Sequence, residues 1–124
     1  MGFELSSADG ASSVVYVPGV LDLDASLHAR LSAAGLVLID GTFFTDDEMI
    51  ASGASQKTSR LMGHAPLTGS GGLLEFLQTV IGPRKALVHI NNSNPALRAD
   101  SPERWSIEEQ GVALSSDGDT FVVG

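Results

Sequence analysis

Three residues of this chain carry side chains suited to metal binding or acid–base chemistry. Asp40 and His89 each follow a short apolar run, and His64 lies in the long segment between them. Because the carboxyl ends of neighbouring parallel strands meet at one edge of a sheet, we expect these three side chains to converge. One carboxylate and two imidazoles suit a first-row divalent metal, and they also suit proton transfer near neutral pH.

Each of these residues also has a purely structural interpretation. Asp40 opens the tripeptide Asp-Gly-Thr, which commonly forms a turn after a strand. His89 would then be a hydrogen-bonded structural histidine, and His64 a solvated loop residue. The remaining histidine, His28, falls within a helical pattern and is interpreted as a surface residue. Spacing alone leaves these interpretations open.

Four polar residues near the three are candidates for contacts with a substrate. Lys57 and Arg60 lie in the long loop, where they would bind a substrate carboxylate or remain solvated charges. Asn91 and Asn92 come shortly after His89 and would contact a substrate or hydrogen-bond within their own turn.

The elements that must position these residues alternate between strands and helices. The patterns predict strands at 3–5, 14–17, 36–39, 85–90, 112–114 and 120–123, helices at 24–34, 72–80 and 101–110, and a capping box at 45–48. Asp-Gly pairs at 9–10 and 117–118 predict hairpins at both ends of the chain. The continuous apolar runs 36–39 and 86–90 are typical of strands buried on both faces. The order predicts an α/β fold in a single domain, residues 1–124.

The composition argues against several classes of protein. The chain has 124 residues, a formal net charge of -8 and no cysteine. The negative charge argues against nucleic acid as a partner, and the lack of cysteine excludes disulfides and thiolate ligands. No apolar stretch approaches the ~20 residues of a membrane span, and the first residues lack a signal-peptide pattern. We therefore expect a cytoplasmic protein that binds neither nucleic acid nor membranes.

A series of short motifs, in order along the chain, resembles one known family. The motifs are Tyr16-Val17-Pro18-Gly19, Asp40-Gly41-Thr42-Phe43, Asp46–Ile50, Lys57-Thr58, Met62-Gly63-His64, His89–Asn92 with Asn94-Pro95, Asp100-Ser101 with Glu103-Arg104, and Asp117-Gly118. Together they resemble the PqqB family of pyrroloquinoline quinone (PQQ) biosynthesis, within the metallo-β-lactamase superfamily. The resemblance covers nearly the whole chain.

The resemblance implies both a fold and a reaction. It implies the C-terminal half of an αββα sandwich, with a mixed sheet and helices packed on one face. Asp40 matches the metal-bridging aspartate of the superfamily and His89 its last histidine ligand, while His64 matches a histidine that acts as an acid or contacts the substrate. The implied metal is iron, with zinc as the alternative. The implied reaction is an iron- and oxygen-dependent hydroxylation of the tyrosine in a Glu-Tyr unit released from the PQQ precursor peptide.

The chain departs from the family in its length and in its metal motif. Family members are much longer, and their N-terminal half carries a His-x-His-x-Asp-His motif that this sequence lacks. The three converging residues would therefore be an incomplete ligand set, and one face of a half sandwich needs a cover. We expect a homodimer, a separate chain that supplies the N-terminal half, or a fragment of a longer protein. The alternatives are a non-catalytic half-domain that binds a partner or small ligand, and a metal-dependent hydrolase.

Overall fold

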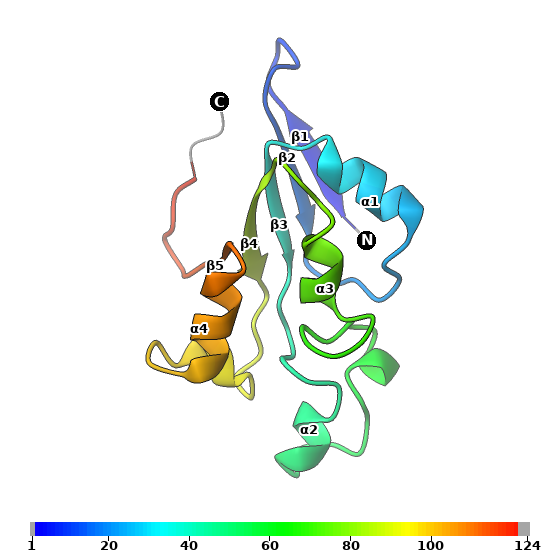
Figure 1. The fold of residues 1–124 in the computed structure, drawn as a ribbon, viewed down its shortest axis with the longest axis vertical. Helices are drawn as coiled ribbons and strands as arrows, with labels where there is room; N and C mark the ends of the chain where they lie inside the picture. The colour runs from blue at the N-terminus through cyan, green and yellow to red at the C-terminus, as the bar shows by residue number, and fades with distance from the viewer. Residues whose placement is uncertain (1, 122–124) are drawn as a thin grey trace.

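The computed structural model describes residues 2–121, in which five strands form one mixed sheet (Figure 1). In their order across the sheet, the strands are β1 (Phe3–Ser6), β2 (Ser13–Val17), β3 (Leu36–Asp40), β4 (Arg84–Val88) and β5 (Val112–Leu114). β1 and β2 form the predicted antiparallel hairpin, whereas β2 to β5 are parallel to one another. The predicted α/β class and mixed sheet are confirmed.

Short helices connect the strands. They are α1 (Ala25–Ser32), α2 (Glu48–Ala51), the 3-10 helix η1 (Arg60–Met62), α3 (Leu73–Leu77), the 3-10 helix η2 (Pro95–Leu97) and α4 (Pro102–Glu109). As the sequence predicts, the side chains of Asp24 and Ser101 cap α1 and α4 by accepting backbone N–H groups. None of the described helices is long and apolar enough to cross a membrane.

The hydrophobic core lies between one face of the sheet and helices α1, α3 and α4. Alternate strand residues point into it, namely Val15, Val17, Val37, Ile39, Leu87, Val112 and Leu114. They belong to one cluster with the buried helix residues Leu31, Leu73, Leu74, Leu77 and Ile107. This packing fixes β3 beside β4, with Asp40 paired to Val88, so the carboxyl ends of the two strands meet.

The opposite face of the sheet is only partly covered within residues 2–121. Tyr16 is 36% exposed, and Leu38 and Val88 are only partly buried. The prediction that both apolar runs are buried on both faces is therefore wrong at Leu38 and over residues 88–90, where Val88 and Ile90 are partly buried and His89 is exposed. The reason is that the cluster of buried side chains joins the helices to the other face alone.

The predicted hairpin at the end of the chain is also wrong over its described part. Thr120 and Phe121 are irregular, and residues 122–123 of that predicted strand lie outside the described residues. The chain after β5 instead closes a local turn, in which the Asp119 carboxylate accepts the N–H of Ser116 at 2.7 Å. A local side-chain bond of this kind offers the backbone an alternative to strand pairing.

Two element boundaries near the predicted site are also shifted. α2 begins at Glu48, because the Glu48 carboxylate accepts the N–H of Phe44 instead of closing a capping box with Thr45. β4 ends at Val88 and not at residue 90. His89 is thus the first residue after the strand.

Gly41 lies where the chain leaves β3 and passes close to β4. A Cβ atom at this position would be 2.8 Å from the Cβ of the fully buried Leu87. We expect Gly41→Ala to lower the free energy of unfolding by about 1–3 kcal/mol in a urea titration, because the two strands would have to separate. Gly19→Ala is the control, since its Cβ would meet only Cε1 of His64, at 3.9 Å. Equal effects of the two substitutions would contradict this account.

Candidate metal centre

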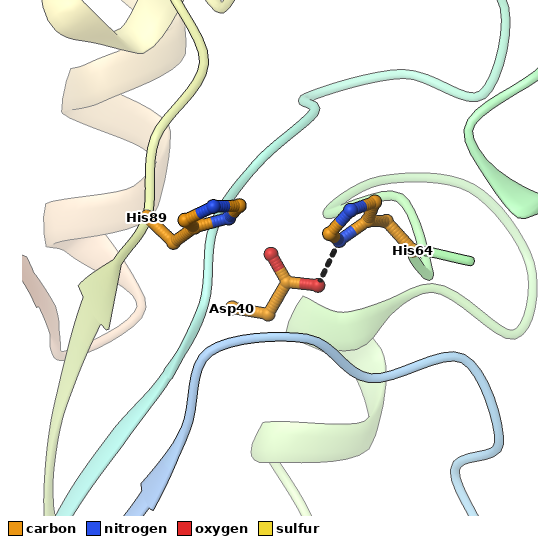
Figure 2. A group of neighbouring side chains, drawn as sticks. All are labelled: Asp40, His64 and His89. Carbon is orange, nitrogen blue, oxygen red and sulfur yellow. Dashed lines mark hydrogen bonds and ion pairs between the residues drawn. The ribbon is translucent and has the colours of Figure 1, made fainter. Parts of the chain in front are cut away.

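The carboxyl ends of β3 and β4 bring Asp40 and His89 together, and the segment after η1 adds His64 (Figure 2). Asp40 is fully buried, His64 is partly buried and His89 is exposed. One possible ligand atom from each residue lies within 4.8 Å of the other two. The predicted convergence of these three side chains is therefore present in the structure.

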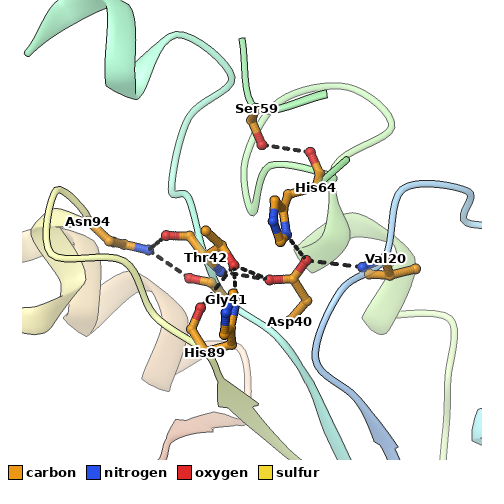
Figure 3. Close-up of polar contacts among 8 residues, drawn as sticks. All are labelled: Val20, Asp40, Gly41, Thr42, Ser59, His64, His89 and Asn94. Atoms are coloured by element: carbon orange, nitrogen blue, oxygen red, sulfur yellow. Dashed lines mark hydrogen bonds and ion pairs between the residues drawn. The ribbon is translucent and has the colours of Figure 1, made fainter. Parts of the chain in front are cut away.

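The carboxylate of Asp40 is held by four contacts (Figure 3). Oδ1 accepts the backbone N–H of Thr42 at 2.9 Å and lies 2.5 Å from its hydroxyl oxygen. Oδ2 accepts the N–H of Val20 at 3.1 Å and lies 2.6 Å from Nδ1 of His64. A buried carboxylate is costly unless donors surround it, so these contacts both offset the burial and fix the orientation of the group.

His89 has a strained backbone. Its φ is +56°, and it is the one non-glycine residue with positive φ among residues 2–121. Such a conformation costs about 1–3 kcal/mol and persists only where surrounding contacts enforce it, most often at functional sites. The hydroxyl oxygen of Thr42 lies 2.9 Å from the carbonyl oxygen of His89 and 2.8 Å from its Nδ1. Thr42 therefore contacts both the strained backbone and the ring.

Hydrogen bonds anchor the loop after His89 to the end of β3 and to α2. Asn94 donates to the carbonyl oxygen of Gly41 at 2.9 Å, and Ser93 donates to the carboxylate of Glu48 at 2.5 Å. Sequence reasoning missed the roles of Thr42, Ser93 and Glu48. The signals that were available were the position of Thr42 two residues after Asp40 and the acidic residue of the capping-box pattern.

In the part of the chain that it describes, the structure brings none of the four predicted substrate-binding residues into contact with the three converging side chains. Lys57 and Arg60 are exposed, and the guanidinium of Arg60 lies 3.7 Å from the carboxylate of Asp46. Asn91 is partly buried and Asn92 is exposed. Within residues 2–121, none of the four is hydrogen-bonded to the three converging side chains.

A cavity of about 570 Å³ lies beside His89 on the partly covered face of the sheet. Its lining includes Tyr16 and Val88 from the sheet, His89 and Ile90, and Ser115 after β5. The exposed ring of His89 can therefore be approached from this side.

The donor set fits a divalent metal of the first transition row. Two imidazoles and one carboxylate form the triad typical of non-haem iron sites with open positions, and zinc accepts the same ligands. Asp40, His64 and His89 would hold such an ion, which would replace one of the four contacts of the Asp40 carboxylate. Three protein ligands leave further positions for water, a substrate or ligands from elsewhere. The side chains thus fit the metal implied by the sequence resemblance.

Comparison with known proteins identifies the wider family. Residues 1–90 match the family model described as the Beta-lactamase superfamily domain. The chain belongs to the beta-lactamase superfamily. The matched residues of this superfamily domain include Asp40, His64 and His89.

Several relatives within the superfamily are named coenzyme PQQ synthesis protein B. The chain is 44% identical to the protein of Gluconobacter oxydans over 94% of its own length and 38% of the relative's. It is 45% identical to that of an Azoarcus species, over 95% of the chain and 39% of the relative. The chain spans about two fifths of the length of these curated relatives, and the resemblance to PqqB is confirmed.

A solved structure matches both the fold and the sequence. It is the crystal structure of Zn²⁺-bound PqqB from Methylobacterium extorquens, which superposes with a TM-score of 0.92 at 37% identity. The match covers 98% of this chain and 43% of the solved chain.

Proposed function

We propose that this chain contributes a metal half-site to a PqqB-like protein of PQQ synthesis. Asp40 and His89 would be metal ligands, and His64 would be a third ligand or an acid at the substrate. The observation that carries the proposal is the convergence of one carboxylate and two imidazoles at the ends of β3 and β4. The relatives named for PQQ synthesis and the Zn²⁺-bound PqqB structure support it.

The reaction we propose is hydroxylation of the tyrosine ring in a substrate derived from Glu-Tyr. In this reaction one oxygen atom of O₂ would enter the ring and the other would leave as water, with two electrons from an external reductant. A bound ferrous ion would supply the redox chemistry with oxygen, which zinc cannot supply. Asp40 would direct its fixed negative charge toward the ion. His64 lies beside Asp40, and its ring stacks on that of His89 with the ring centroids 5.7 Å apart, so it is suited to moving a proton at a substrate held there. The exposed Lys57 and Arg60 are proposed to bind the substrate carboxylates, and Asn91 and Asn92 its polar groups.

A further polypeptide is part of the proposal. The partly covered sheet face is apolar at Tyr16, Leu38 and Val88, and three protein ligands leave metal positions open. The relatives are more than twice as long as the matched region, so we propose that the rest of a PqqB-like protein covers this face and completes the ligand set. A second copy of the chain is the alternative cover.

Metal titration of the 124-residue chain tests this proposal. We expect saturable binding of Fe²⁺ without oxygen, and of Zn²⁺, in calorimetry against a competing chelator. His89→Ala should weaken the affinity for both metals about 100-fold, because it removes one of the few ligands that share the binding free energy of a small metal site. His28→Ala is the control, because His28 lies on α1 and contacts the carbonyl oxygen of Thr79.

Two outcomes would contradict the metal site. One is the lack of saturable binding, and the other is an equal loss of affinity in the His89 and His28 variants. Tight binding of zinc together with failure to bind Fe²⁺ would favour the hydrolase alternative over hydroxylation.

A further inference from the structure

The hydroxyl group of Thr42 lies between two residues of the proposed metal site. Its oxygen is 2.5 Å from Oδ1 of Asp40 and 2.8 Å from Nδ1 of His89, and the carbonyl oxygen of His89 is 2.9 Å away (Figure 3). Thr42 is only 5% exposed, so its hydroxyl must find its hydrogen-bond partners among these groups. A hydroxyl has one hydrogen to donate, and it cannot serve all three neighbours.

The carboxylate of Asp40 takes this hydrogen. It is the nearest of the three acceptors and the charged one, and hydrogen bonds to an ionised acceptor are roughly twice as strong as neutral ones. The hydroxyl oxygen then turns its lone pairs toward His89. Of the two His89 groups near this oxygen, the carbonyl oxygen can only accept and Nδ1 can carry a hydrogen, so the donor to Thr42 is Nδ1 of His89.

A neutral imidazole is protonated at only one of its two nitrogens. We propose that Thr42 is a positioning residue that holds His89 in the tautomer with hydrogen on Nδ1, which leaves the lone pair of Nε2 free for a metal ion. The metal part of this inference rests on the proposed function, whereas the tautomer does not.

His64 provides an internal comparison. Its Nδ1 lies 2.6 Å from Oδ2 of Asp40, and an ionised carboxylate can only accept, so Nδ1 of His64 also carries a hydrogen. Asp40 therefore orients both imidazoles, His64 directly and His89 through the hydroxyl of Thr42. Removal of that hydroxyl should release His89 and leave His64 unchanged.

Nitrogen NMR on the metal-free, ¹⁵N-labelled chain tests the tautomer, with the pH raised until the spectrum itself shows both rings to be neutral. In the unsubstituted chain we expect His89 to show a protonated Nδ1 and an unprotonated Nε2. Thr42→Ser keeps the hydroxyl and should preserve this pattern, whereas Thr42→Val should abolish it for His89 but not for His64. Thr68→Val is the matched control, because the hydroxyl of Thr68 donates to the carbonyl oxygen of Phe44 instead.

Zinc affinity provides the second measurement. Thr42→Val should bind Zn²⁺ about 10- to 100-fold more weakly, the usual effect of removing a group that orients a ligand, while the Ser and Thr68 variants should match the unsubstituted chain. A hydrogen on Nε2 of His89 in the unsubstituted chain would overturn the inference without recourse to any variant, and so would an unchanged His89 pattern in Thr42→Val. If the unsubstituted chain binds no zinc, the proposed function fails, and the nitrogen pattern still decides the role of Thr42.

Discussion

Asp40→Asn is expected to weaken metal binding by the chain by about 100-fold or more and to destabilise its fold. The substitution removes the one carboxylate among the three converging side chains and replaces it with a neutral amide. The amide also presents an NH₂ group where a carboxylate oxygen now accepts hydrogen bonds. One of the neighbouring donors, the N–H of Val20 or the N–H of Thr42, then loses its buried acceptor. Such a loss costs about 1–3 kcal/mol.

Two measurements on the same samples check this prediction. Chelator competition gives the metal affinity, and urea unfolding without metal gives the stability. Asp22→Asn is the matched control, because Asp22 is exposed and the same chemical change there should alter stability by less than about 0.5 kcal/mol. Native stability combined with native metal affinity in Asp40→Asn would exclude Asp40 as the organising residue of the site.

Supplying the rest of a PqqB-like protein is expected to change the metal affinity of the chain by an even larger factor. We expect co-expression with the part of the Gluconobacter oxydans relative that the match leaves out to give a stable complex. Its Zn²⁺ affinity should exceed that of the chain alone by at least about 1,000-fold, because closed sites with a full ligand set reach binding free energies of about 10–16 kcal/mol. Light scattering after size exclusion gives the stoichiometry, and chelator competition gives the affinity.

Surface substitutions show which face of the chain forms that complex. Tyr16→Asp places a charge on the partly covered face of the sheet and should prevent assembly, since an unpaired charge in an apolar interface is costly. Ile81→Asp is the control, because Ile81 is 78% exposed and lies in the loop between α3 and β4. If the complex still forms with Tyr16→Asp, the added polypeptide binds another surface of the chain. If the chain alone forms a homodimer and Tyr16→Asp disrupts it, a second copy of the chain is favoured as the polypeptide that covers this face.

The positions of Asp40 and His89 were predictable because strand ends can be recognised locally. Short apolar runs define β3 and β4, and parallel pairing then brings the ends of the strands together. The helix caps Asp24 and Ser101 were predictable for the same reason, since each bond spans three residues. Local patterns therefore located the site, although they left the boundaries of its elements uncertain by a few residues.

The support of the site was not predictable, because it depends on contacts between distant segments. The bond between Ser93 and Glu48 joins residues 45 positions apart, and the contact of Thr42 with His89 joins residues 47 positions apart. The left-handed backbone of His89 likewise follows from tertiary contacts, as histidine has no local requirement for it. Predicting these features requires the paired strands to be placed first.

The positive φ of His89 also constrains how this position can change during evolution. Asparagine, aspartate and glycine tolerate the left-handed region best, whereas β-branched residues are rare outliers there. A lineage that no longer needed the imidazole would therefore drift most easily to one of the first three residues, with the loop preserved. Valine, isoleucine or threonine at the position would instead require the loop to be rebuilt, so homologues with such residues should differ in loop length or sequence after β4.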